Sequence, residues 1–129
     1  MNQMSALDQY KAIGVQSKMT DASPHQMITM LLDGALDRIA VAKGAIDRHE
    51  VARKGEAIGR TIAIIDSMRA SLDHQGGGEI AANLGSLYDY MESKLVEANT
   101  TSNKEMLDEV STLLKEIKAG WESIPSDMR

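Results

Sequence analysis

Apolar residues recur along most of the chain at alternating spacings of three and four, which is the pattern of one face of an α-helix. The apolar positions of the first run are Ile28, Leu32, Ala35, Ile39, Ala42 and Ile46. Ser23, before this run, is a favoured N-cap residue, Pro24 suits the first helical position, and Gln26 completes a capping box. The pattern predicts a helix that begins after Ser23 and extends to about Ile46.

Two further runs of the same period occupy the middle of the chain. The apolar positions of the second run are Ile58, Ile62, Ile65, Met68 and Leu72. Those of the third run, which begins at about Glu79, are Ile80, Leu84, Leu87, Met91, Leu95 and Ala98. The sequence DHQGGG at 73–78 separates the two, and consecutive glycines lose too much backbone entropy to continue a helix. We therefore expect two helices joined by a glycine turn.

The last run follows the polar sequence NTTSN at 99–103. Ser102 and Glu105 have the spacing of a capping box, and Pro125 ends the run because proline cannot continue a helix. Its apolar positions are Leu107, Val110, Leu114, Ile117, Trp121 and Ile124. Four amphipathic segments of roughly 20 residues, each about 30 Å long, with short connections predict an all-α fold, an antiparallel up-down-up-down four-helix bundle.

The segment before the first helix is less periodic. Its apolar residues, which favour a short helix or a strap, are Leu7, Tyr10, Ile13 and Val15. We expect an N-terminal tail or lid at 1–20, the bundle at 21–125 and a C-terminal tail at 126–129. No run approaches the ~20 apolar residues that span a bilayer, and the start of the chain lacks the basic and apolar regions of a secretory signal. We therefore expect a cytoplasmic protein with no membrane insertion.

The composition changes the picture in three ways. There is no Phe but there are nine Met, which favours helices with adaptable packing over sheets. The net charge is −5 with scattered Lys and Arg, which argues against nucleic acid as a partner because no basic stripe can neutralise phosphates. The absence of Cys excludes disulfides and thiolate metal ligands.

Candidate chemistry is sparse. A di-iron bundle needs Glu-x-x-His pairs, and the chain contains none. His25, His49 and His74 lie near predicted helix ends or in loops, which is typical of ordinary surface histidines. The GGGE sequence at 76–79 lacks the Lys of a phosphate-binding loop, and no Ser has the flanking residues of a nucleophile elbow. We expect no catalytic residues, no metal and no cofactor, so the protein is predicted not to be an enzyme.

Asp33 is the one carboxylate that interrupts an apolar run. On a helical wheel it lies about 140° from Ile28, so it is off the core stripe. A buried catalytic acid with a raised pKa is therefore not implied.

Several apolar residues lie outside the predicted core stripes. Met30 and Val41 point away from the stripe of the first helix, with Gly34 between them, and Tyr88 and Tyr90 flank the stripe of the third helix. A glycine inside a helix costs about 1 kcal/mol relative to alanine, so close approach of another chain is one reason to place it there. Any one of these residues is explained as a scattered surface apolar group. As a set they favour grooves that accept an amphipathic partner helix.

Three stretches together resemble a known family. The sequences ASPHQMITMLLDGAL, SLYDYMESKLVEAN and LDEVSTLLKEIKAGW resemble, in order and spacing, three blocks of the FliS family of flagellin-specific export chaperones, and QYKAIGV resembles the segment before the first block. The resemblance implies an antiparallel helical bundle that binds the disordered C-terminal segment of flagellin, which becomes helical as it wraps the bundle. Binding would prevent premature polymerisation and keep flagellin competent for type III export until it reaches a flagellar export gate component. The N-terminal tail would act as a displaceable lid over part of the groove.

The residues expected to contact the partner come from the tail, the first helix and the third helix. They are Tyr10, Val15, Met30, Asp33, Gly34, Val41, Leu87, Tyr88, Tyr90, Met91, Leu95 and Asn99. Asp33 is expected to pair with a basic or amide group of the partner or the tail. The alternative is a structural bundle that self-associates through the same grooves, and the sequence leaves open whether the free protein is a monomer or a weak dimer.

Overall fold

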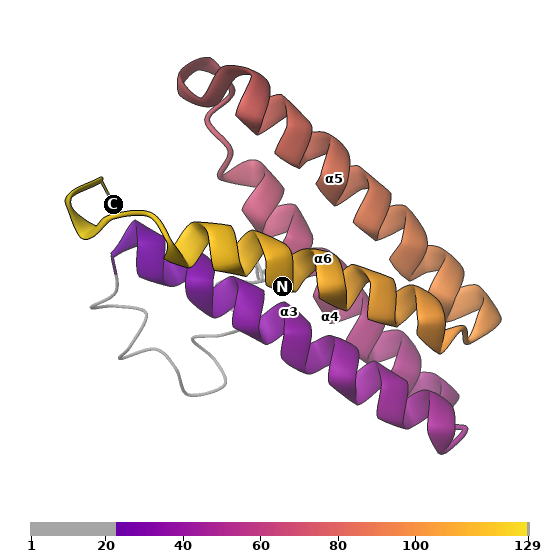
Figure 1. Cartoon of the computed structure of the whole chain (residues 1–129). Helices are drawn as coiled ribbons and strands as arrows, with labels where there is room; N and C mark the ends of the chain where they lie inside the picture. The colour runs from indigo at the N-terminus through magenta and orange to yellow at the C-terminus, as the bar shows by residue number, and fades with distance from the viewer. Residues whose placement is uncertain (1–22, 129) are drawn as a thin grey trace, which may run out of the picture.

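The computed structural model describes residues 23–128, and all regular structure in that range is helical. The elements are α3 (Pro24–Asp47), α4 (Val51–Ala70), α5 (His74–Thr101), α6 (Lys104–Glu122) and the short 3-10 helix η2 (Ser126–Met128). Consecutive long helices run in opposite directions (Figure 1). The predicted all-α four-helix bundle is confirmed. The tail predicted at 1–20, with Tyr10 and Val15, lies outside the described residues.

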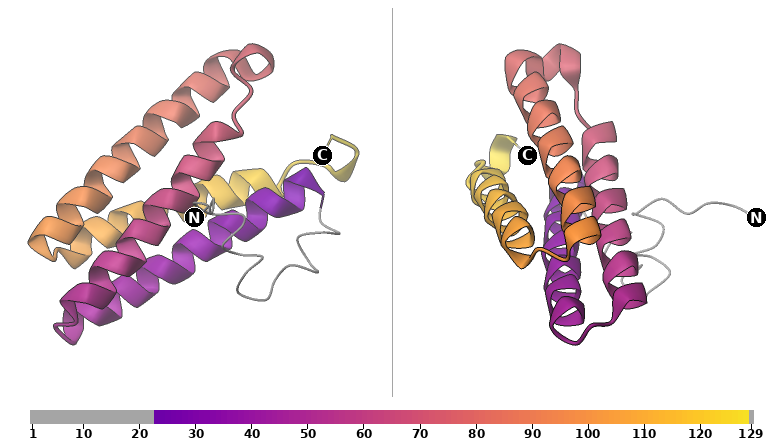
Figure 2. Two further views of the ribbon diagram at one scale, coloured as in Figure 1. Left: turned by 180° about the vertical axis from the view of Figure 1, so that it is seen from behind. Right: turned by 90° about the vertical axis from the view of Figure 1, so that its right-hand side faces the viewer.

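The four long helices pack as two pairs that cross at an angle. Within the described range α3 packs against α4 and α6, and α5 packs against the same two helices. Figure 2 shows that the α4–α5 pair diverges from the α3–α6 pair, so that the turn between α4 and α5 lies apart from the start of α3. The opposite end of the bundle, where α3 turns into α4, is the more tightly gathered one.

The core is built from the predicted stripes. The largest fully buried side chains are Leu32, Ile39, Ile58, Thr61, Ile65, Met68, Met91, Leu95, Leu107, Val110 and Leu114. Thr61 is the member that no predicted stripe contained, and it fits because its hydroxyl donates to the carbonyl of Ala57 one turn earlier, at 2.9 Å. Burial of these side chains at roughly 25 cal/mol per Å² is the main force that holds the helices together.

The two predicted capping boxes had different outcomes. At the start of α3 the Ser23 hydroxyl accepts from the Gln26 amide at 3.1 Å and the Gln26 side chain accepts from the Ser23 amide at 2.9 Å, which confirms the first box. The second prediction was wrong, because Ser102 ends α5 in the left-handed conformation (φ 51°) and Asn103 caps α6. The Ser102 hydroxyl instead accepts from the ammonium of Lys54 at 2.7 Å.

The predicted glycine turn contains a short helical turn of its own. α5 begins at His74, where the Asp73 side chain accepts from the amide of Gly76 at 2.9 Å and caps this turn. Gly78, at φ 53°, leaves the helical conformation and kinks α5, so the long continuous part of the helix starts at about Glu79, as predicted. The prediction that Ile80 belongs to the core was wrong, since 72% of its surface is exposed. Ile80 lies at the end of α5 that diverges from α3 and α6 (Figure 2), so these helices do not cover it.

Candidate functional site

The described part of the chain offers no group of three or more histidine and carboxylate side chains that could hold a metal ion. In the same part, no helix is long and apolar enough to cross a membrane. What the structure offers instead is a set of surface features on α3, α4 and α5, where most of the predicted contact residues lie.

Asp33 forms an ion pair that joins α3 to α6. Its Oδ1 lies 2.5 Å from Nζ of Lys118, and half of the Asp33 side chain is exposed to solvent. The hydrogen bond to Asp33 raises the pKa of the Lys118 ammonium. In this structure the basic group beside Asp33 therefore comes from the chain itself. A basic or amide group of a partner would have to replace Lys118 to make the predicted contact.

The other predicted residues of α3 differ in exposure. Met30 is partly buried and Gly34 is buried. Val41 is also partly buried, and it packs against the core while one side of it borders a surface hollow between α3 and α4. Val41, one of the predicted contact residues, thus borders a concave part of the described surface.

The predicted residues of α5 divide into core and surface. Tyr88 is 4% exposed and Met91 and Leu95 are completely buried, so their side chains hold the bundle together in this structure. Leu87 is only partly buried against the core, and Asn99 is exposed. The carbonyl oxygen of Asn99, in the last turn of α5, accepts a hydrogen bond from Lys54 Nζ at 2.8 Å.

Tyr90 is the aromatic side chain of the predicted set that faces outwards. It is 42% exposed, and its hydroxyl donates to Oε2 of Glu109 on α6 at 2.5 Å. The Lys94 ammonium lies 5.6 Å from the centre of its ring, within the range of a cation–π contact. Val96, two residues beyond Lys94, is 57% exposed. This part of α5 therefore presents an aromatic ring and, six positions later, an aliphatic side chain, both open to solvent.

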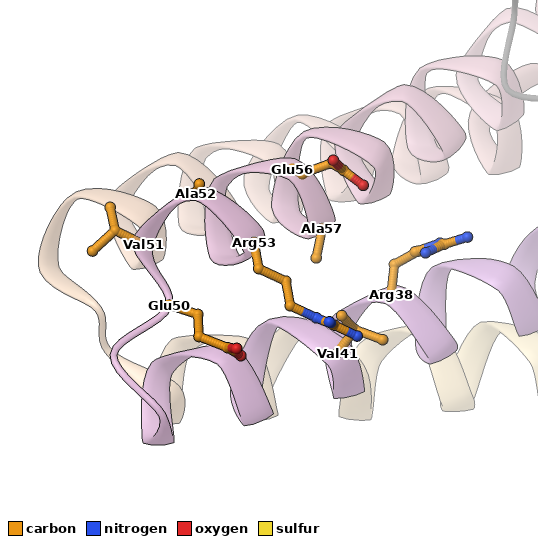
Figure 3. A pocket seen from close by; sticks show the side chains of 8 residues that line it. All are labelled: Arg38, Val41, Glu50, Val51, Ala52, Arg53, Glu56 and Ala57. Atoms are coloured by element: carbon orange, nitrogen blue, oxygen red, sulfur yellow. The ribbon is translucent and has the colours of Figure 1, made fainter.

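The hollow between α3 and α4 has a volume of about 700 Å³ and lies at the end where the two helices meet. It is lined by Arg38, Val41, Glu50, Val51, Ala52, Arg53, Glu56 and Ala57 (Figure 3). Figure 3 shows Arg53 reaching from α4 towards α3 with its guanidinium beside Val41, while Arg38 extends from α3 into the space between the helices. Small apolar side chains and two cations thus share one depression. We call it the α3–α4 hollow.

Sequence reasoning missed both arginines of the α3–α4 hollow. Arg38 carried a detectable signal, because no acidic residue lies three or four positions away on either side to pair with it along the helix. Arg53 carried none, since Glu50 and Glu56 stand at such spacings. In the structure both glutamates pair with other arginines. Glu56 pairs with Arg60 at the i,i+4 spacing of a helix, and Glu50 pairs with Arg48 at a spacing of two that the helix rule does not cover.

A second polar cluster joins α4 to α5. Arg69 lies 2.8 Å from Asp66, 2.7 Å from Asp89 and 2.5 Å from Glu92, measured between guanidinium nitrogens and carboxylate oxygens. Burial raises the pKa of Glu92 to about 7, helped by the hydrogen bond that protonated Glu92 donates to the Asp66 carboxylate. One arginine thus faces three carboxyl groups, and one of the three changes charge near neutral pH.

The three histidines were expected to be ordinary surface residues, and for His25 this was wrong. His25 is buried at the start of α3, 7% exposed, and stacks on Trp121 near the end of α6 with ring centres 4.8 Å apart. His49 is exposed in the α3–α4 turn at φ 58°. Neither is placed beside a nucleophile or a second histidine.

Comparison with known protein sequences shows to which family the chain belongs. A sequence profile of the family described as Flagellar protein FliS matches residues 6–128. The chain is 46% identical to Flagellar secretion chaperone FliSB of Pseudomonas aeruginosa, over 96% of this chain and 98% of that protein. It is 41% identical to Flagellar secretion chaperone FliS of Salmonella typhimurium, over 93% of this chain and 90% of that protein.

The protein of the same name from Vibrio cholerae is 38% identical over 95% of this chain and 90% of that protein. These matches cover almost the whole length of each partner in the comparison. The chain therefore belongs to the FliS family, a family of flagellar secretion chaperones and not of enzymes.

Proposed function

We propose that this protein is a cytoplasmic chaperone that binds the disordered C-terminal segment of flagellin. The bound segment folds into helices on the bundle, cannot polymerise, and stays competent for type III export until it is delivered to a component of the flagellar export gate. The observation that carries the proposal is the family membership over nearly the whole chain, with relatives named flagellar secretion chaperones. The surface supports it through apolar side chains that the bundle leaves uncovered.

These uncovered groups are spread over two helices. Val51 is 72% exposed on α4, and Ile80, Val96 and Tyr90 are 72%, 57% and 42% exposed on α5. Ile80 and Val96 lie 16 positions apart on one helix, about 24 Å along its axis, which is farther than a single compact ligand reaches. An extended segment that wraps the bundle can reach several of them, and this is the binding mode of a client that folds as it binds.

The energetics favour an extended contact. Ordering a disordered segment costs about 2–5 kcal/mol or more of the gross interaction energy. At roughly 25 cal/mol per Å², burial of about 80 Å² of apolar surface offsets an ordering cost of about 2 kcal/mol, and about 200 Å² offsets about 5 kcal/mol. Standard protein interfaces bury several times that area, so a wrapped segment can fold and still bind with useful affinity.

The contact residues that we propose follow from exposure. Met30, Val41, Leu87, Tyr90 and Asn99 are exposed or partly exposed and can meet the client directly. We propose that the buried members of the predicted set, which hold the helices that shape this surface, act indirectly; they are Gly34, Tyr88, Met91 and Leu95. We propose Tyr10 and Val15 as residues of a tail that the client displaces.

Titration with a peptide of the flagellin C-terminal segment from the same bacterium tests the proposal. Calorimetry should show a negative heat-capacity change, since apolar surface is buried. Circular dichroism should show more helix in the mixture than in the separate components. Absence of binding at peptide concentrations well above the micromolar range, or binding without a gain of helix, would overturn it. Sedimentation of the protein alone measures the alternative, a bundle that self-associates through the same surface.

A further inference from the structure

The α3–α4 hollow combines three properties that a carboxylate-bearing chain end requires. It has a volume within the range of pockets that hold small organic ligands, four apolar residues in its lining and two guanidinium groups. Its lining includes Val41 and Ala57, which pack with the core, and Val51, which is 72% exposed at the start of α4. An apolar side chain placed there would bury these groups from water.

Arg38 and Arg53 are not used elsewhere in the described structure. The other described arginines all form ion pairs, Arg48 with Glu50, Arg60 with Glu56, and Arg69 with its three carboxyl partners. Among residues 23–128, the cationic side chains with neither an ion pair nor a hydrogen bond are Arg38, Arg53 and Lys115. Two of these three line the same hollow.

The acidic residues of the hollow do not neutralise these two arginines. Glu50 is held by Arg48 at 2.8 Å, and Glu56 lies 3.5 Å from Arg60, in both cases through the arginine Nε. The first turn of α4, which borders the hollow, adds the positive end of the helix dipole. The hollow thus holds two arginines without an ion-pair partner, beside two glutamates that each face another arginine.

We propose that the α3–α4 hollow binds the C-terminal α-carboxylate of the client together with its last apolar side chain. The inference rests on the proposed function, in which the client segment is the C-terminal one. Arginine recognises a carboxylate through two parallel N–H···O bonds, and two arginines that reach into one space can grip both oxygens. The α-carboxylate is the anionic group that every C-terminal segment carries, whatever its sequence.

Two peptides and three protein variants test this assignment. The peptides are the flagellin C-terminal segment with a free carboxylate and the same peptide with a C-terminal amide, which differ only in the charge at the chain end. The variants are Arg38→Gln, Arg53→Gln and the double variant. Lys115→Gln is the matched control, because it removes the same charge from an exposed site on α6 that does not line the hollow. Circular dichroism and urea denaturation confirm that each variant is folded.

Amidation should weaken binding to the unmodified protein by about tenfold or more, since charge-assisted pairs are the stronger hydrogen bonds. The double variant should lose a similar factor for the carboxylate peptide and should bind the two peptides equally. Each single variant should show part of the loss, and Lys115→Gln should change the affinity by less than about twofold.

Equal binding of the two peptides to the unmodified protein would overturn the assignment while leaving the proposed function intact. An equal loss for both peptides in the double variant would also overturn it, because the arginines would then hold a side chain of the client. A changed sedimentation of the free variant without a changed peptide affinity would assign the hollow to a second copy of this chain. Failure of the carboxylate peptide to bind the unmodified protein would overturn the proposed function itself, and this inference with it.

Discussion

His25 and Trp121 hold each other through two hydrogen bonds and a ring stack. The His25 Nε2–H donates to the carbonyl of Trp121 at 2.7 Å, and the Trp121 indole Nε1–H donates to the carbonyl of His25 at 2.9 Å. The rings are nearly parallel, 6° apart, with centres separated by 4.8 Å. The two residues lie 96 positions apart in the chain, so these contacts fix the start of α3 against the end of α6. They thereby hold the α3–α6 pair together at the end of the molecule where the α4–α5 pair diverges from it (Figure 2).

Trp121→Phe keeps an aromatic ring in the stack but removes the indole donor. We expect a loss of about 1 kcal/mol in the free energy of unfolding, the usual worth of one such hydrogen bond. Trp121→Ala removes the stack as well and should cost more, about 2–3 kcal/mol, which is below the cost for a fully buried tryptophan because this side chain is only partly buried. Urea denaturation of the two variants measures the difference. Equal losses would mean that the ring stack contributes nothing, and no loss in Trp121→Phe would mean that the indole hydrogen bond contributes nothing.

Lys54 supports the left-handed end of α5. Its buried ammonium donates to the Asn99 carbonyl at 2.8 Å and to the Ser102 hydroxyl at 2.7 Å, where the helix dipole is negative. Lys54→Met should lower the free energy of unfolding by about 1–3 kcal/mol, because it leaves these acceptors without their donor. Lys115→Met, at an exposed position of α6, should change it by less than about 0.5 kcal/mol. Comparable effects of the two substitutions would contradict the proposed role of Lys54.

The fold could be predicted because period and capping residues are local signals. Ile39, Ile65 and Leu107 all lie at positions where the spacing placed them in the core, and all are buried. Ile80 shows where this reasoning stops. It continues its stripe without a break, but whether another helix covers that end of α5 depends on the angle between the helix pairs, which the spacing does not specify.

The surface could be predicted less well, because pairing across helices is a tertiary property. Met91 and Leu95 belong to a sequence block that suggested a binding surface, yet the same positions are the ones that the core requires. Lys118 and Asp33 are far apart in sequence, and Lys54 reaches Ser102 only after α4 and α5 have packed. The geometry of the α3–α4 hollow likewise exists only once the two helices are joined by their turn.

Glu92 predicts a pH dependence of stability. Its ordinary pKa of 4.5 applies to the unfolded chain, and burial together with Asp66 raises its pKa to about 7 in the folded protein. Between these values the folded state binds more protons than the unfolded state, so stability falls as the pH rises. Its contribution is complete below about pH 4.5 and is lost by about pH 7.

Glu92→Gln resembles the protonated carboxyl group and should remove this dependence. The variant should match the unmodified protein near pH 5 and exceed its free energy of unfolding near pH 8 by about 1–2 kcal/mol. One pKa unit corresponds to about 1.4 kcal/mol, and solvent around a side chain that is 19% exposed screens part of the total. Urea denaturation at both pH values measures the difference in free energy of unfolding between the variant and the unmodified protein. A variant that is less stable than the unmodified protein near pH 8 would show that the ion pair with Arg69 outweighs the burial of Glu92.

Asp33 and Lys118 predict opposite effects of two substitutions on client binding. Both side chains are substantially exposed and their ion pair adds little to stability, so Asp33→Ala and Lys118→Met should leave the fold intact. If a basic or amide group of the client replaces Lys118 beside Asp33, Asp33→Ala should weaken the flagellin peptide complex, by roughly three- to tenfold for the loss of one polar contact. Lys118→Met removes the competing ammonium and should leave the affinity unchanged or increase it. Peptide titration of both variants, with circular dichroism as the check on folding, distinguishes the cases: weakening by both substitutions would show that the ion pair itself shapes the binding surface, and weakening by neither would place the client away from the α3–α6 contact.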